Sequence, residues 1–181
     1  HTGVPGLDLV PANIDLSAAE IQMVNEVGRE HTLARALRPV RRDYDFIIID
    51  CQPSLGLLTI NALTASHGVI IPLETEFFAL RGVALLVETV ERVKDRLNAT
   101  LEIDGILATM VDSRTLHSRE VIERLEQAFG EQLFDTRIRR TIKFPDASVA
   151  NEPITSYAPS HPGADAYRRL AREVIARGDV A

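Results

Sequence analysis

The chain has 181 residues, of which 45% are apolar and 25% charged, and this balance fits a globular protein with a sizeable hydrophobic core. Its net charge of −6 excludes a protein that binds nucleic acid through its overall field, so DNA contact needs a local basic patch. The single cysteine, Cys51, excludes an internal disulfide framework and suits a reducing cytosol. No apolar run approaches the ~20 residues of a membrane span.

The first predicted elements are a short strand at Leu7 to Ala12 and a long helix from about Ala18 to Leu37. Ser17 and Glu20 have the spacing of a capping box, which predicts the start of that helix. Pro39 then prevents the helix from continuing.

The next element is an apolar run, Phe46 to Ile49, that ends at Asp50. It lacks the alternation of a half-exposed strand. We therefore expect a strand that is covered on both faces, as in a parallel sheet flanked by helices.

Strands and helices then alternate along the chain. The predicted order is helix Leu57 to Ser66, strand Gly68 to Pro72, amphipathic helix Ala79 to Leu97, strand Ile103 to Val111, and helix Ser118 to Phe129 closed by Gly130. Leu133 to Ile138 is a candidate fourth strand, Arg139 to Pro162 reads mostly as loop, and Ala164 to Arg177 as the last helix. This order predicts an α/β fold with a doubly wound, mostly parallel sheet, helices on both faces, and one domain over residues 1–181.

Asp50 lies where ligands bind in open α/β sheets, beyond the carboxyl end of a strand. A buried strand that ends in aspartate is typical of a Walker B element, whose carboxylate holds Mg²⁺ directly or through water. The plain alternative is a loop that happens to begin with aspartate. Pro53 to Gly56 predicts a tight turn into a helix, of the kind that rearranges around a γ-phosphate. Cys51 reads as a small buried filler, because no histidine nearby would activate it.

The segment YDFIIIDCQPSLGLLTINAL closely resembles the Walker B and switch II region of the ParA/Soj family, P-loop ATPases with a deviant Walker motif that segregate bacterial chromosomes and plasmids. Further segments resemble the family in the same order, so the likeness covers nearly the whole chain. They are LDLVPANIDLSAAE before this region, and VIIPLETEFFALRG, IDGILATMVDSRT, TRIRRTIKFPDAS and PITSYAPSHPGADAYRRLAREV after it.

The P-loop that the family places upstream is absent. No GxxxxGK[ST] motif occurs, and no lysine precedes Lys94. We therefore expect the chain to be the carboxyl-terminal portion of a longer ParA-type ATPase, inactive by itself. The alternative is a P-loop-less, non-enzymatic module that binds DNA or protein.

The resemblance implies roles for individual residues. Asp50 is implied as the catalytic carboxylate that coordinates Mg²⁺, directly or via water, in an ATP site. The switch II residues are Gln52, Pro53, Ser54 and Gly56, and the residues near the adenine are Met110, Asp112, Ile138, Arg139 and Arg140. Core packing is an equally plain interpretation of Met110.

Arg114 and Lys143 match two basic positions that the family uses for DNA binding without sequence preference. Arg137, Arg139 and Arg140 add to a basic cluster in an acidic chain, although a solvated loop is the bland alternative.

The whole resemblance implies an ATP-dependent homodimer that binds non-specific DNA, with hydrolysis stimulated by a ParB-like partner, in the cytoplasm on the nucleoid. We expect the last helix to pack on the sheet, without stable membrane insertion; a helix on a membrane surface is the alternative. No histidine spacing predicts zinc. Departures from the family pattern at Gln52, Arg81, Arg139 and Pro145 to Ser148 indicate a divergent subgroup.

Overall fold

A computed structural model of the chain describes residues 2, 4–75, 79–112 and 114–178. Its contacts divide the chain into two compact units, residues 1–65 and residues 66–181, called here the N-terminal and C-terminal units. The prediction of one domain therefore stays a prediction. Within the described residues, no helix is long and apolar enough to cross a bilayer.

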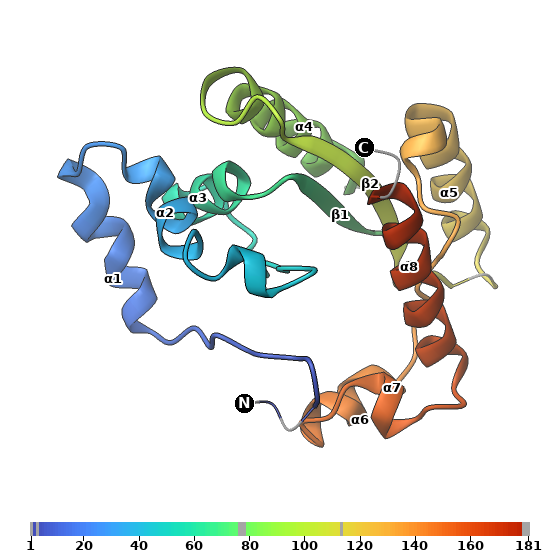
Figure 1. Cartoon of the computed structure of the whole chain (residues 1–181). Helices are drawn as coiled ribbons and strands as arrows, with labels where there is room; N and C mark the ends of the chain where they lie inside the picture. Colours follow the sequence, from blue (N-terminus) through green and yellow to red (C-terminus); the bar gives the residue numbers. More distant parts are fainter. Residues whose placement is uncertain (1, 3, 76–78, 113, 179–181) are drawn as a thin grey trace. The chain divides into compact units, whose positions relative to one another are not determined.

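The N-terminal unit contains short helices rather than the single helix predicted for residues 18–37. Gly28 interrupts the pattern with a left-handed backbone, φ 67° and ψ 31°, which glycine adopts without strain. The helical elements are α1 (Asp15–Gln22), η1 (Met23–Asn25), η2 (Arg29–His31), α2 (Thr32–Leu37), η3 (Arg41–Asp43) and α3 (Leu57–Ala65) (Figure 1). The prediction of α3 is confirmed, and α2 ends before Pro39 as expected.

The capping box predicted at Ser17 and Glu20 is wrong. The side chain of Asn13 accepts the Asp15 N–H at 3.0 Å, so α1 begins earlier than expected, and the Ser17 hydroxyl donates to the Ile14 carbonyl at 2.6 Å. Glu20 is left to make a tertiary contact with the start of α3. The spacing of Ser17 and Glu20 therefore predicted a helix, but not the group that the Glu20 carboxylate contacts.

The two strands predicted in the N-terminal unit are also wrong, since no described residue of this unit lies in a strand. Val10 is 93% exposed and Ile48 is 92% exposed. A strand exists only through hydrogen bonds to a neighbouring strand. The described part of this unit offers none, and a hydrogen bond of 2.8 Å from the Tyr44 hydroxyl to Asp8 joins the two segments instead.

The C-terminal unit holds a parallel sheet of β1 (Gly68–Glu74) and β2 (Glu102–Thr109), which lie side by side in Figure 1. Helix α4 (Ala79–Arg96) connects them, and α5 (Leu116–Phe129) and α8 (Pro162–Gly178) follow. These strands and helices confirm the predicted alternation. The 139–162 region was expected to be mostly loop, which is wrong: it forms α6 (Lys143–Val149) and α7 (Ile154–Tyr157) after η4 (Gly130–Gln132). Residues 76–78 of the family-like motif lie outside the described residues.

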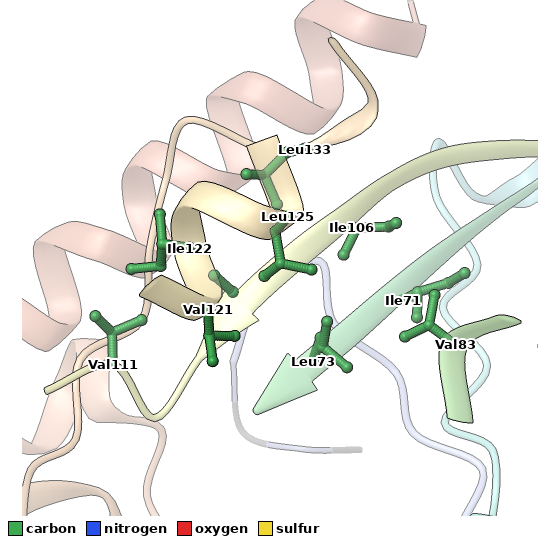
Figure 2. Packing of buried hydrophobic residues seen from close by; sticks show 10 residues of the cluster. Ile71, Leu73, Val83, Ile106, Val111, Val121, Ile122, Leu125 and Leu133 are labelled. Carbon is green, nitrogen blue, oxygen red and sulfur yellow. The ribbon is translucent and has the colours of Figure 1, made fainter. Parts of the chain in front are cut away.

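Helices cover both faces of this sheet, as predicted. Ile106 and Ala108 of β2 pack in one core cluster, whereas Leu107 between them packs in another, because side chains alternate along a strand. Figure 2 shows the first cluster, in which residues of β1 and β2 meet α4 and α5; it comprises Ile71, Leu73, Val83, Ile106, Ala108, Val111, Val121, Ile122, Leu125 and Leu133. The second cluster adds Phe134, Ile138 and Ala166 of α8.

The predicted fourth strand is reduced to isolated bridges, Ile106 with Leu133 and Val111 with Arg139. Phe134 donates to the Ile106 carbonyl and Ile138 to the Ala108 carbonyl, both at 2.9 Å. The segment therefore advances from 134 to 138 while β2 advances only from 106 to 108, and it must bulge between.

The carboxylate of Glu173 on α8 accepts hydrogen bonds from the backbone of this bulge. It accepts the N–H groups of Asp135 at 2.7 Å and Thr136 at 3.1 Å. A side chain from a distant helix thus replaces the strand ladder, which is why the apolar pattern alone overestimated the strand.

Candidate functional site

One candidate region is the turn that follows Asp50 in the N-terminal unit. Asp50 is exposed, and the turn after it is ordered by local hydrogen bonds. Ser54 N–H donates to the Gln52 carbonyl at 2.8 Å, and the Gln52 side chain donates to the Ser54 hydroxyl at 2.8 Å. The structure thus places the predicted switch II residues in one tight turn before α3. Cys51 is exposed, so its interpretation as a buried filler is wrong.

Two side chains that the sequence did not identify hold this turn against α3. The buried Thr59 hydroxyl donates to the Ser54 carbonyl at 2.6 Å. Glu20 accepts the Leu58 N–H at 3.1 Å, and its Oε1 lies 2.5 Å from where a Cβ on Gly56 would stand. A side chain at position 56 would therefore displace the Glu20 carboxylate from its present position. The capping-box spacing hid this role of Glu20.

Asn61 supports α3 from its other side. This residue is 3% exposed, yet it satisfies all its hydrogen-bonding groups within the unit. Its amide donates to the Arg29 carbonyl at 2.9 Å and to the Leu57 carbonyl at 3.0 Å, and its oxygen accepts the Leu33 N–H at 3.0 Å. A buried asparagine in an apolar helix was the only sequence signal for it.

Asp50 suits a magnesium ion that takes most of its ligands from water and substrate. No group of three or more His, Cys, Asp or Glu side chains in the described ranges is arranged to hold a metal by itself. Mg²⁺ commonly takes one or two carboxylates and completes its octahedron with waters and substrate phosphates. An exposed carboxylate beside an ordered turn suits that role.

A separate candidate region is the carboxyl end of β2 in the C-terminal unit. Val111 donates to the Ile138 carbonyl at 3.0 Å and accepts the Arg140 N–H at 3.1 Å. This bridge brings Met110 and Asp112 beside the 138–140 segment, so the residues predicted near a nucleotide base do lie together. The Ile138 side chain is 3% exposed, whereas Arg139 and Arg140 are exposed.

Met110 has an unusual backbone, with φ at 53° in the left-handed region. For a residue with a Cβ this conformation is strained, and such strain often occurs at functional sites. The turn redirects the chain from β2 to Asp112. It separates the buried strand from the exposed residues that follow.

The candidate DNA-contacting cations are both paired within the chain. Arg114, whose side chain is 87% exposed, donates Nε to Oδ1 of Asp112 at 3.0 Å and Nη2 to Oδ2 at 2.8 Å. The side-chain and backbone hydrogen bonds from Arg114 lower the pKa of Asp112 to about 2. Lys143 Nζ lies 3.1 Å from Asp146 Oδ2 and 5.9 Å from the centre of the Tyr157 ring.

Arg137 is committed as well, in an ion pair with Glu126 of α5. Three cations of the basic cluster expected from the sequence, Arg114, Arg137 and Lys143, are therefore paired with carboxylates of the same unit. The hydrogen bond from Arg140 to Val111 connects the segments that carry Arg114 and Lys143.

Comparison with known proteins places the chain in a family. Residues 1–103 match the family model described as an AAA domain. An uncharacterized protein of Mycobacterium tuberculosis is 63% identical over 177 residues, covering 98% of this chain and 56% of the relative. The sporulation initiation inhibitor protein Soj of Bacillus subtilis is 47% identical over 177 residues, covering 98% of this chain and 70% of Soj.

One solved structure has a similar fold over most of this chain. It is a cobyrinic acid a,c-diamide synthase of Mycobacterium smegmatis with bound ADP and magnesium, with 40% identity, a TM-score of 0.74, and coverage of 90% of this chain and 59% of that one. The chain thus spans little more than half the length of the first relative it matches and of this solved structure. On the identity and coverage shared with Soj, the chain belongs to the ParA/Soj family, with the α/β fold of P-loop NTPases.

Proposed function

We propose that the protein to which this chain belongs is an ATP-dependent, DNA-binding dimer switch that acts in chromosome or plasmid partitioning. The observation that carries the proposal is 47% identity to Soj along 98% of the chain, which includes the carboxylate, the turn and the helix at 50–65. Because the chain spans 56% of its first relative, activity belongs to the longer protein.

In this proposal Asp50 holds Mg²⁺, directly or through a water, and the ion neutralises phosphate charge when bound. Gln52 to Gly56 forms the switch that responds to the γ-phosphate, and Glu20 and Thr59 hold its far end. Water attacks the γ-phosphate, while the P-loop outside these 181 residues supplies the phosphate cradle and its lysine.

The residues around Val111 receive the nucleotide base in this proposal. Met110 and Asp112 flank Val111 in the chain, and Arg139 and Arg140 lie on the segment that bridges to Val111. The solved relative with ADP and magnesium supports a nucleotide in this fold.

Arg114 and Lys143 contact DNA phosphates without reading the bases. ATP-driven dimerisation doubles these contacts and so raises DNA affinity, and a ParB-like protein stimulates hydrolysis and release. The protein then works in the cytoplasm, on the nucleoid. The second candidate is a non-enzymatic module that binds DNA or protein without a P-loop.

The test is ATP hydrolysis by the longer protein. Asp50→Ala removes the proposed magnesium carboxylate, and we expect turnover to fall by about 100-fold or more, the scale of losing a key electrostatic group. Asp45→Ala, an exposed aspartate on the same segment, is the matched control and should retain turnover. Unchanged hydrolysis in Asp50→Ala eliminates the Walker B assignment, and a wild type without ATPase activity favours the binding module.

A further inference from the structure

Arg114 and Lys143, the two cations proposed to contact DNA, have a similar arrangement that the proposed function does not explain. Each is exposed or half-exposed, and each is already bound to an aspartate close to it in the chain: Arg114 to Asp112, and Lys143 to Asp146. The side chains of Lys143 and Asp146 are each 41% exposed, so water and ions reach the pair.

The Asp112 carboxylate binds Arg114 as a phosphate would. Two parallel N–H···O hydrogen bonds, of 3.0 and 2.8 Å, form the bidentate geometry that guanidinium also makes with phosphate. The Arg114 backbone N–H donates to the same carboxylate at 3.1 Å, which fixes the acceptor in place. The arginine fork that would bind DNA is occupied by an internal anion.

Lys143 is held in a similar way from two sides. Asp146, one turn along α6, accepts from Nζ at 3.1 Å, and the Tyr157 ring lies beneath the ammonium at 5.9 Å. The ammonium therefore has both a counter-charge and an aromatic face before any DNA approaches.

We propose that Asp112 and Asp146 act as internal competitors of DNA phosphate, so that binding exchanges each carboxylate for a phosphate oxygen and the two aspartates set DNA affinity. The inference depends on the proposed DNA contact by Arg114 and Lys143. An exposed ion pair is weak enough for a phosphate to displace. Single contacts are therefore poor, and stable binding requires the multiple contacts of a dimer.

The carboxylate of Asp112 stays ionised at physiological pH, since its pKa is about 2. The competition is therefore present throughout the neutral range and is relieved by phosphate or by mutation rather than by protonation.

The experiment measures binding of the longer protein, at saturating ATP, to a random-sequence duplex in about 100 mM salt. Asp112→Asn and Asp146→Asn should each tighten binding by about two- to five-fold, the range of an exposed ion pair. Asp165→Asn is the matched control: it removes one negative charge from an i,i+3 pair with Arg168 on α8 and should change affinity much less. Dimer formation by every variant is followed by light scattering in the same ATP, which separates DNA affinity from nucleotide occupancy.

Double-mutant cycles test whether each aspartate acts on DNA affinity through its paired cation. Asp112→Asn should have no effect in an Arg114→Gln background, nor Asp146→Asn in a Lys143→Gln background, because the competitor then has nothing to release. If an aspartate variant tightens DNA binding equally in the wild-type background and in the Gln background, net charge explains the effect and the inference is overturned. The same holds if Asp165→Asn tightens binding equally. If Arg114→Gln weakens binding while Asp112→Asn leaves it unchanged, the inference fails and the proposed DNA contact survives. If the wild type binds no DNA at 50 mM salt, both fail.

Discussion

The two units of the chain treat the same kind of sequence in opposite ways. Ile48, in the apolar run before Asp50, is 92% exposed, whereas Ile106, in the middle of β2, is fully buried. Both lie in runs that predict a covered strand. The difference teaches that an apolar run becomes a strand only where the chain also supplies neighbours for its backbone and both of its faces.

Polar side chains show the same contrast. In the N-terminal unit, Asn61, Thr59 and Glu20 hold α3 and the turn before it. In the C-terminal unit, apolar clusters on both faces of β2 carry the packing, and polar groups such as Glu173 complete it at the edge.

The largest expected effect is on the free energy of unfolding, and it distinguishes Ile106 from Ile48. Ile106→Ala leaves a cavity in the first core cluster and should lower the free energy of unfolding of the 181-residue chain by about 2–5 kcal/mol. Ile48→Ala removes an exposed side chain and should change it by less than about 0.5 kcal/mol. Urea unfolding, with hydrogen exchange of the β2 amides, measures both. Similar costs for the two changes would contradict the exposure of Ile48.

An intermediate effect compares the two carboxylates that accept backbone N–H groups from another element. Glu173 accepts two such groups and pairs with Arg177, whereas Glu20 accepts one. Glu173→Gln should cost about 1–3 kcal/mol, the scale of hydrogen bonds to a charged group, and Glu20→Gln should cost less. Chemical denaturation at pH 7 ranks the pair, and an equal or reversed order would show that the 134–138 bulge does not depend on the charge.

The Glu173 charge also has a pH signature. Partial burial works to raise the pKa of this carboxyl, but the N–H donors of Asp135 and Thr136 and the charge of Arg177 prevail and lower it. A depressed folded pKa gives stability that is present above the unfolded pKa and is lost as pH falls through the folded one. Wild type should therefore lose its advantage over Glu173→Gln on acidification below about pH 4.5, the unshifted value. A constant difference between pH 7 and pH 3 would refute this.

The smallest effect uses one substitution in both units. Gly28 has φ 67°, so Gly28→Ala should destabilise the N-terminal unit by about 1 kcal/mol. Gly82 lies inside α4 with open space around its Cβ position, so Gly82→Ala should stabilise the C-terminal unit by about 0.5–1 kcal/mol. Opposite signs in thermal unfolding are expected; the same sign would mean that one of these backbones differs from the description.

Much of the C-terminal unit was predictable because its signals are local. Thr115 caps α5 by accepting the Ser118 N–H at 3.3 Å, and Gly130 ends that helix with φ 51°. In α4, Val83, Val90 and Val93 are nearly fully buried, as their helical spacing predicted. Helices α6 and α7 were missed because proline, serine and aspartate around them resemble loop residues, although aspartate is compatible with a first helical turn.

The candidate site was predictable in part for the same reason. The turn at 52–56 and the closeness of Asp112 to Arg114 follow from residues that are neighbours in the chain. That Arg114 is bidentate to Asp112, and Lys143 paired with Asp146, required the side-chain geometry, because the sequence pattern indicated only a basic cluster.

The sequence by itself determined the ParA/Soj family, the alternation of β1, α4, β2 and α5, and the turn after Asp50. Only the tertiary structure decided that 46–48 is exposed within this chain, that Glu20 and Glu173 serve distant backbone groups, and that Arg114 and Lys143 are already paired. Periodicity and capping act over a few residues and are written in local order. Hydrogen bonds and ion pairs between elements depend on the path of the whole chain, which local order does not specify.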